Sequence, residues 1–173
     1  EDWTESELAT HSFGQGVTVT MVQLANAYCT LANGGILMQP YIIDEIRHDD
    51  GTITKTEPHE IRRVISEETS STMTAMLTYS TENGVANNAQ VSRHFVAGKT
   101  GTSQTYKHGK ALSGPGTTLT SFAGYGPVED PQFVILVKFD HPRASEWGSA
   151  TAAPTFSKVA EYLFNYYNIP PDK

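Results

Sequence analysis

The sequence contains a single cysteine, Cys29, and no long apolar or basic stretch. One thiol excludes an internal disulfide, a zinc cluster built on cysteines and a redox pair. No apolar run approaches the roughly 18 to 20 residues that a membrane-spanning helix needs. The 12 basic residues are scattered and outnumbered by 19 acidic ones, for a net charge of −7. A nucleic-acid partner is therefore not expected, because phosphate binding requires concentrated positive charge.

The composition is that of a folded protein, with 38% hydrophobic and 10% aromatic residues over 173 positions. No internal repeat or shift in composition divides the chain, so one domain spanning 1–173 is expected. The sequence begins at Glu1 in a polar stretch, without an initiator methionine. This start suggests part of a longer protein.

The first half is expected to hold two helices with a β-hairpin between them. Thr20 can cap a helix over 21–32 that ends at Gly34-Gly35 and contains Cys29 as a small buried thiol. Asp50-Gly51 lies between two β-rich runs and suits a tight hairpin turn. A second helix is expected from Ser66, with an apolar face that we interpret as core, formed by Met73, Met76 and Leu77.

His48, Asp49 and Asp50 are adjacent at the hairpin turn and could in principle be metal ligands. Turn chemistry explains the two acids without an ion, and no second ligand cluster accompanies them. We expect neither a metal nor a cofactor.

The second half predicts three strands and a final helix. The strands are expected over 95–103, 119–125 and 133–139, the last two joined by the short connection GPVEDP. Residues 107–116 are expected to form a mobile loop whose basic residues are solvated. Pro154 is expected to open a helix with one apolar face, which carries Phe156, Val159, Ala160, Leu163, Phe164 and Tyr167. The fold class is mixed α+β, with an antiparallel sheet and a helix packed on one face.

The stretch FVAGKTGTSQT, residues 95–105, resembles the end of a phosphate-binding loop at first sight. Such a loop needs an early glycine that is separated by four residues from Gly-Lys-Ser/Thr, and a helix must follow it. Arg93 occupies the early position, and a glycine-rich loop follows instead of a helix. A phosphate site is therefore rejected.

If residues 99–103 form an extended strand, each of them can have a role in binding a ligand. The two-residue period directs Lys99, Gly101 and Ser103 to one side and Thr100 and Thr102 to the other. Lys99 would supply a cation near a reacting hydroxyl, and Gly101 would leave room for a ligand along the strand. The hydroxyls and edge amides could bind a peptide and its terminal carboxylate. Taken alone, Lys99 is better explained as an exposed lysine that protects a strand edge, and only the flanking segments reverse this preference.

Four segments together resemble the C-terminal half of the transpeptidase domain of class B penicillin-binding proteins. They are SFGQGVTVTMVQLANAYCTLANGG, VAGKTGTSQ, TSFAGYGPVEDPQFVILVKFD and WGSATAAPTFSKVAEYL, in that order. The Lys-Thr-Gly at 99–101 is the third motif of the active-serine set of this superfamily. The resemblance covers nearly the whole chain, from about 3 to 171. It implies a β-lactamase-like fold in which this chain contributes the sheet and part of the helical lobe.

The resemblance implies a bacterial D,D-transpeptidase that cross-links peptidoglycan stem peptides outside the cytoplasmic membrane and is acylated by β-lactams. Lys99 and Thr102 would be catalytic, through the proton network and an oxyanion-binding amide. Thr100, Gly101, Thr102 and Ser103 would bind substrate. A longer parent would carry a membrane anchor and contact proteins of an elongation or division complex.

Two motifs of the set are missing from the sequence. No serine is followed by lysine at the third position, and Thr52 with Lys55, which has this spacing, falls in the expected hairpin. Thr81-Glu82-Asn83 imitates Ser-x-Asn but follows SFGQG, whereas the family's motif precedes it. The nucleophile is therefore expected upstream of Glu1, and this chain alone is expected to be inactive.

Two alternatives remain open. The chain could be a non-catalytic module that binds peptidoglycan peptides or division-complex partners, or it could belong to a carboxypeptidase or β-lactamase relative. For Ser12 to Gln15, scaffold packing is favoured over direct chemistry.

Overall fold

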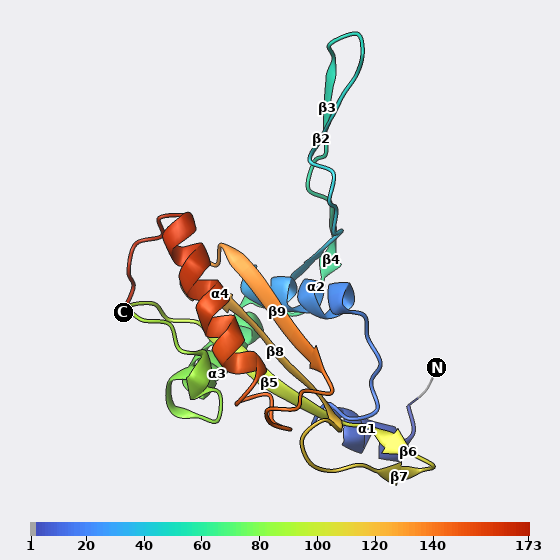
Figure 1. Cartoon of the computed structure of the whole chain (residues 1–173). Coiled ribbons are helices and arrows are strands. Elements are labelled where there is room, and N and C mark those ends of the chain that lie inside the picture. The colour runs from blue at the N-terminus through green and yellow to red at the C-terminus, as the bar shows by residue number, and fades with distance from the viewer. Residues whose placement is uncertain (1–2) are drawn as a thin grey trace.

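A three-stranded antiparallel sheet forms the centre of the computed structural model, which describes residues 3–173. The strand order is β5 (Ala97–Gln104), β8 (Thr118–Gly126) and β9 (Phe133–Asp140), so β8 is central and β5 is an edge. Helices lie on both sides of the sheet (Figure 1). The expected mixed α+β class is confirmed, and so is the hairpin that joins the last two strands.

One face of the sheet is covered by helix α4 (Ala152–Tyr166). Phe122 of β8 packs against Phe156 of α4 with ring centroids 4.5 Å apart, and both side chains are fully buried. Phe164 is buried on the same side of the helix. The helix begins at Ala152 rather than Pro154, which lies in its first turn, where a proline is tolerated.

The apolar face expected for the last helix is partly wrong. Phe156, Ala160 and Phe164 are buried, but Val159 and Tyr167 are 38% and 58% exposed. The sheet is only three strands wide, so α4 contacts it along a narrow stripe and the flanking positions stay in solvent.

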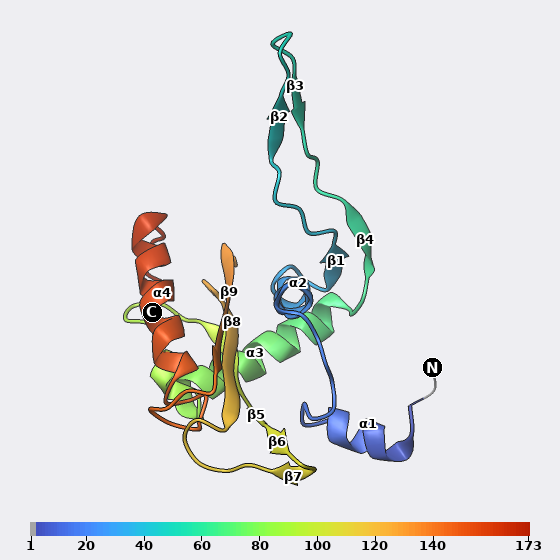
Figure 2. The ribbon, with the colours of Figure 1, turned by 45° about the vertical axis from the view of Figure 1, so that its right-hand side comes forward.

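Helices α2 (Met21–Ala32) and α3 (Glu67–Asn83) cover the opposite face (Figure 2). The Thr20 side chain caps α2 and Ser66 caps α3, as expected. Leu77 of α3 is buried in a cluster with Ala97 and Tyr125 of the sheet. The assignment of Met73 and Met76 to the core is wrong, because the buried positions of α3 are Ser70, Leu77 and Thr81.

An arm projects from the body between α2 and α3 (Figures 1 and 2). Its outer part is the expected hairpin, β2 (Glu45–Arg47) paired with β3 (Ile53–Lys55). Its inner part is a second ladder, β1 (Ile36–Met38) with β4 (Glu60–Arg63), which the sequence did not indicate.

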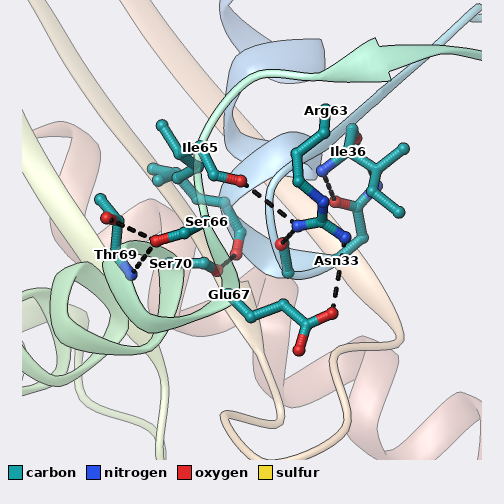
Figure 3. Close-up of polar contacts among 10 residues, drawn as sticks. Asn33, Ile36, Arg63, Ile65, Ser66, Glu67, Thr69 and Ser70 are labelled. Atoms are coloured by element: carbon teal, nitrogen blue, oxygen red, sulfur yellow. Dashed lines mark hydrogen bonds and ion pairs between the residues drawn. The ribbon is translucent and has the colours of Figure 1, made fainter.

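The base of the arm is held by polar contacts to the helix ends (Figure 3). The Arg63 guanidinium donates to the Gly34 carbonyl at 2.6 Å and lies 3.4 Å from the Glu67 carboxylate. The Asn33 side chain exchanges two hydrogen bonds with the backbone of Ile36. Gly35 has φ +100°, and a Cβ there would lie 2.2 Å from the Ile65 carbonyl oxygen, so glycine is required.

Smaller elements complete the chain. They are helix α1 (Glu5–His11), a 3₁₀ turn at Asn87–Ala89, and strands β6 (Tyr106–Lys107) and β7 (Lys110–Ala111). The loop expected over 107–116 thus contains a short hairpin, because His108 and Gly109 adopt positive φ and form its turn. Within 3–173, none of the helices is both long and apolar enough to span a membrane.

Candidate functional site

Strand β5, which carries Lys-Thr-Gly, leaves one backbone edge unpaired by the sheet. Within residues 3–173 it forms its ladder with β8 alone. The register continues to Thr105, whose N–H donates to the Thr117 carbonyl on the β8 side at 3.2 Å. Because amide directions alternate along a strand, the N–H groups of Thr100, Thr102 and Gln104 point away from β8. The edge therefore offers amide donors to a ligand.

A cavity of about 820 Å³ lies along this edge. Its walls are five consecutive residues of β5, 99–103, together with parts of β8 and β9. The chain before and at the start of α2 forms another wall, including Ser12, Phe13, Gly14 and Gln15. The structure thus brings all the expected site residues, Lys99 to Ser103, onto one cavity. The scaffold segment SFGQG, for which packing was favoured, also borders it.

The cavity walls carry positive charge. Lys99 and Lys138 line them, and no aspartate or glutamate does so among residues 3–173. The Lys99 ammonium donates to the Thr100 carbonyl at 3.2 Å and lies 3.4 Å from the Thr100 hydroxyl. On a chain of net charge −7, this local excess favours an anionic ligand such as a carboxylate.

The side chains alternate as the strand period predicts. Lys99 is opposite Ala123 in the register, on the face of α2 and α3, whereas Thr100 is opposite Phe122, on the face of α4. Thr102 shares the α4 face, where its hydroxyl accepts a hydrogen bond from the Gly148 N–H at 3.0 Å.

Gly101 is needed for packing as well as for access. A Cβ at this position would lie 2.5 Å from the Ser121 hydroxyl on the neighbouring strand. The sequence suggested only that glycine leaves room for a ligand. The structure adds a second reason for glycine at position 101, which is that the neighbouring strand leaves no room for a side chain.

The cavity is also lined by residues that the sequence did not single out, among them Lys138, Trp147 and Ser149. Lys138 pairs with Ser121 in the register and so shares the face of Lys99. The two-residue period of VILVKFD could have placed it there. Trp147 and Ser149 lie in a segment without strand or helix periodicity, so no local pattern could have located them.

Asp50, at the arm tip, stabilises the turn. The Asp50 carboxylate accepts hydrogen bonds from the Thr52 hydroxyl at 2.7 Å and the Thr52 N–H at 2.9 Å. These two bonds, the hydroxyl first, lower the pKa of Asp50. In the part of the chain that the structure describes, no three His, Cys, Asp or Glu side chains gather as metal ligands would.

Cys29 is partly buried in α2, and burial raises the pKa of its thiol. A raised pKa reduces the thiolate population, which is the reactive form. The cysteine is therefore part of the packing of α2, and its raised pKa disfavours the thiolate form.

The chain is similar to proteins of one known family over nearly its whole length. Residues 1–161 match the family model described as penicillin binding protein transpeptidase domain. Stage V sporulation protein D of Bacillus subtilis is 37% identical over 96% of this chain and 26% of its own length. The chain spans less than a third of each of the first curated relatives it matches.

Solved structures are similar over almost all of the chain. The apo transpeptidase domain of Burkholderia pseudomallei penicillin-binding protein 3 superimposes with a TM-score of 0.84 at 29% identity, covering 99% of this chain and 50% of that one. Penicillin-binding protein 3 of Mycobacterium tuberculosis, complexed with ampicillin, gives 0.83 at 29% identity over 98% of this chain and 39% of that one.

Proposed function

Because the chain belongs to the penicillin-binding protein transpeptidase domain family, we propose that it supplies one wall of the active site of a peptidoglycan D,D-transpeptidase. The observation that carries this proposal is the free edge of β5, which directs the Thr102 amide away from the sheet beside a cavity with two lysines. An extended acyl-peptide can pair with such an edge, and its terminal carboxylate would meet positive charge.

Each residue of the strand has a role in this proposal. The reaction is acyl transfer: a serine oxygen attacks the peptide carbonyl, the bond to the terminal D-alanine breaks, and an amine of a second stem peptide then displaces the serine. The Thr102 N–H would donate to the oxyanion of the tetrahedral intermediate. Lys99 would support proton transfer, while the Thr100 and Thr102 hydroxyls would hold the carboxylate.

The serine would come from the remainder of a transpeptidase domain, of which this chain forms the C-terminal portion. Two observations support this division. The chain covers half of the Burkholderia transpeptidase domain. Apolar side chains on the cavity wall before and at the start of α2 are also exposed, among them Phe13, Val17, Val19 and Met21. Exposed apolar surface of this kind is typical of a face that another segment covers.

The same family membership supports a proposal about where the reaction takes place. The substrate would be the peptidoglycan stem peptide, so the longer protein would act on the outer side of the cytoplasmic membrane. β-Lactams would acylate it, as the ampicillin complex of the Mycobacterium protein suggests by analogy.

Covalent labelling of the longer protein with a fluorescent penicillin tests the proposal. Thr102→Pro removes the outward N–H without breaking a ladder bond, because this amide does not face β8. Because this change also removes the Thr102 hydroxyl, the reference is Thr102→Val, which loses the hydroxyl alone. Relative to that reference, we expect acylation to slow by about 10² to 10³-fold, as for the loss of one oxyanion donor.

Gln104→Pro is the matched control, since its N–H also points outward but Gln104 lies beyond the part of β5 that lines the cavity. It should leave labelling close to wild type. An unlabelled wild-type protein would contradict the transpeptidase proposal and favour a non-catalytic binding module. Efficient hydrolysis of the penicillin after labelling would instead indicate a β-lactamase.

A further inference from the structure

The segment between β9 and α4 lies directly on the Lys-Thr-Gly strand. Gly148 donates its backbone N–H to the Thr102 hydroxyl at 3.0 Å. The contact is close: a Cβ on Gly148 would lie 2.5 Å from the Gly101 carbonyl oxygen and 2.8 Å from that of Ser121. Only glycine allows the segment to approach β5 and β8 so nearly.

Further hydrogen bonds fix the segment on both sides of Gly148. The Thr151 hydroxyl lies 2.8 Å from both the Thr120 hydroxyl and the Trp147 carbonyl, and either of them can accept its one proton. The Thr118 hydroxyl donates to the Glu146 carbonyl at 3.0 Å. Because bonds to β8 lie on either side of it, the Gly148 N–H is held at a set position above the strand.

This arrangement determines what the Thr102 hydroxyl can do. A threonine hydroxyl has one proton and two acceptor lone pairs. One lone pair receives the Gly148 N–H, and among residues 3–173 the Thr102 hydroxyl donates to no protein acceptor. Its proton therefore remains available, and Thr102 lines the cavity.

We infer that Gly148 is a positioning residue, whose N–H holds the Thr102 hydroxyl so that its proton is presented to the carboxylate of the substrate. This inference rests on the proposed function and extends it to a segment outside the Lys-Thr-Gly motif. The segment and the strand then form adjoining parts of one cavity wall, because Trp147 and Ser149, on either side of Gly148, line the same cavity as the strand.

The test compares acylation of the longer protein by benzylpenicillin and by its methyl ester, which lacks the carboxylate. The readout is the ratio of the two second-order rate constants. Gly148→Ala inserts a methyl group where there is no room and displaces the N–H from Thr102. Thr102→Val removes the hydroxyl, and Thr102→Ser retains it.

We expect Gly148→Ala and Thr102→Val each to lower the acid-to-ester ratio by about tenfold, and Thr102→Ser to restore it. The double variant should lose little more than either single one, because both changes remove the same interaction. A purely structural role would slow both penicillins equally and leave the ratio unchanged, which would overturn the inference.

Gly51→Ala, at a positive-φ turn in the arm with open space around it, is the control for general strain at a glycine. It should not change the ratio. If Gly148→Ala fails to fold, hydrogen exchange of the Gly148 amide tests the bond to Thr102 instead. This amide should be protected from exchange in the wild type and in Thr102→Ser, and it should exchange faster in Thr102→Val. Equal protection in Thr102→Val would refute the bond. A wild-type protein that neither penicillin acylates would instead contradict the proposed function itself.

Discussion

The central sheet and the arm are both antiparallel β structure, yet they are stabilised in opposite ways. In the sheet, Phe122 and Tyr125 of β8 are fully buried between helices on the two faces. In the arm, the outer strands expose nearly every residue, and Ile42 is 100% exposed. An isolated two-stranded ribbon is at best marginally stable in water. The arm therefore depends on local bonds and on its base, whereas the sheet depends on burial.

The contrast extends to polar groups. Inside the body, the Thr81 hydroxyl is buried and donates to the Val96 carbonyl at 2.6 Å, and Tyr125 bonds to Thr74 at 2.7 Å. In the arm, the ion pair between Arg47 and Glu45 is largely in solvent. A surface pair contributes little, while an unsatisfied buried group is costly. Equal changes in the two regions should thus have unequal effects on stability.

The largest effect is expected from the core of the α4 face. Phe156→Ala leaves a cavity against Phe122 and should lower the free energy of unfolding by about 3 to 5 kcal/mol. Chemical denaturation measures it. Tyr162→Ala, on the exposed side of the same helix, should change stability by less than about 0.5 kcal/mol. Similar losses in the two variants would contradict the assignment of this core.

An intermediate effect is expected at high pH, where α2 meets the sheet. Burial, with the nearby Tyr125, raises the pKa of Tyr28 to about 12 from an unfolded value of 10.0. A raised acid pKa stabilises the fold fully below pH 10, and this contribution is lost as the pH rises towards 12. The two-unit shift corresponds to about 3 kcal/mol.

Unfolding measured between pH 9 and pH 12 checks this expectation. Tyr28→Phe should remove most of the decrease in the free energy of unfolding at alkaline pH. Part of the remaining decrease is due to Tyr125, because burial also raises the pKa of Tyr125. Tyr162→Phe, on the exposed side of α4, should leave the decline unchanged. An unaltered decline in Tyr28→Phe would show that Tyr28 ionises without cost in the folded protein.

The sequence was sufficient for those elements whose signals are local. Thr20 and Ser66 marked helix starts, and Asp50-Gly51 marked the hairpin turn. The pairing of β1 with β4 joins residues more than twenty positions apart, for which no local pattern exists. Met73 and Met76 were misplaced because apolar character alone does not say which face of α3 meets the sheet.

The candidate site divides in the same way. Lys99 to Ser103 could be predicted as a strand lining a groove, because alternation and the motif both lie within one short segment. The Gly148 contact could not, since it joins positions 46 residues apart and depends on the absence of a side chain. A glycine can occur in a loop for several reasons, such as a turn or a close backbone approach. Only the structure shows that Gly148 is needed because it packs against the backbone of Gly101.

The smallest and most local effect is expected at the base of the arm. Arg63→Ala removes the bonds to the Gly34 and Ile65 carbonyls, both near the exposed surface, so global stability should fall by no more than about 1 kcal/mol. Local opening should be more sensitive: hydrogen exchange of the Val64 amide, which donates to Gly35, should accelerate about five- to tenfold. Arg62→Ala is the control, because Arg62 makes no side-chain bond within residues 3–173. If Arg63→Ala instead destabilised the whole protein as much as Phe156→Ala, the arm and the body would unfold as one unit.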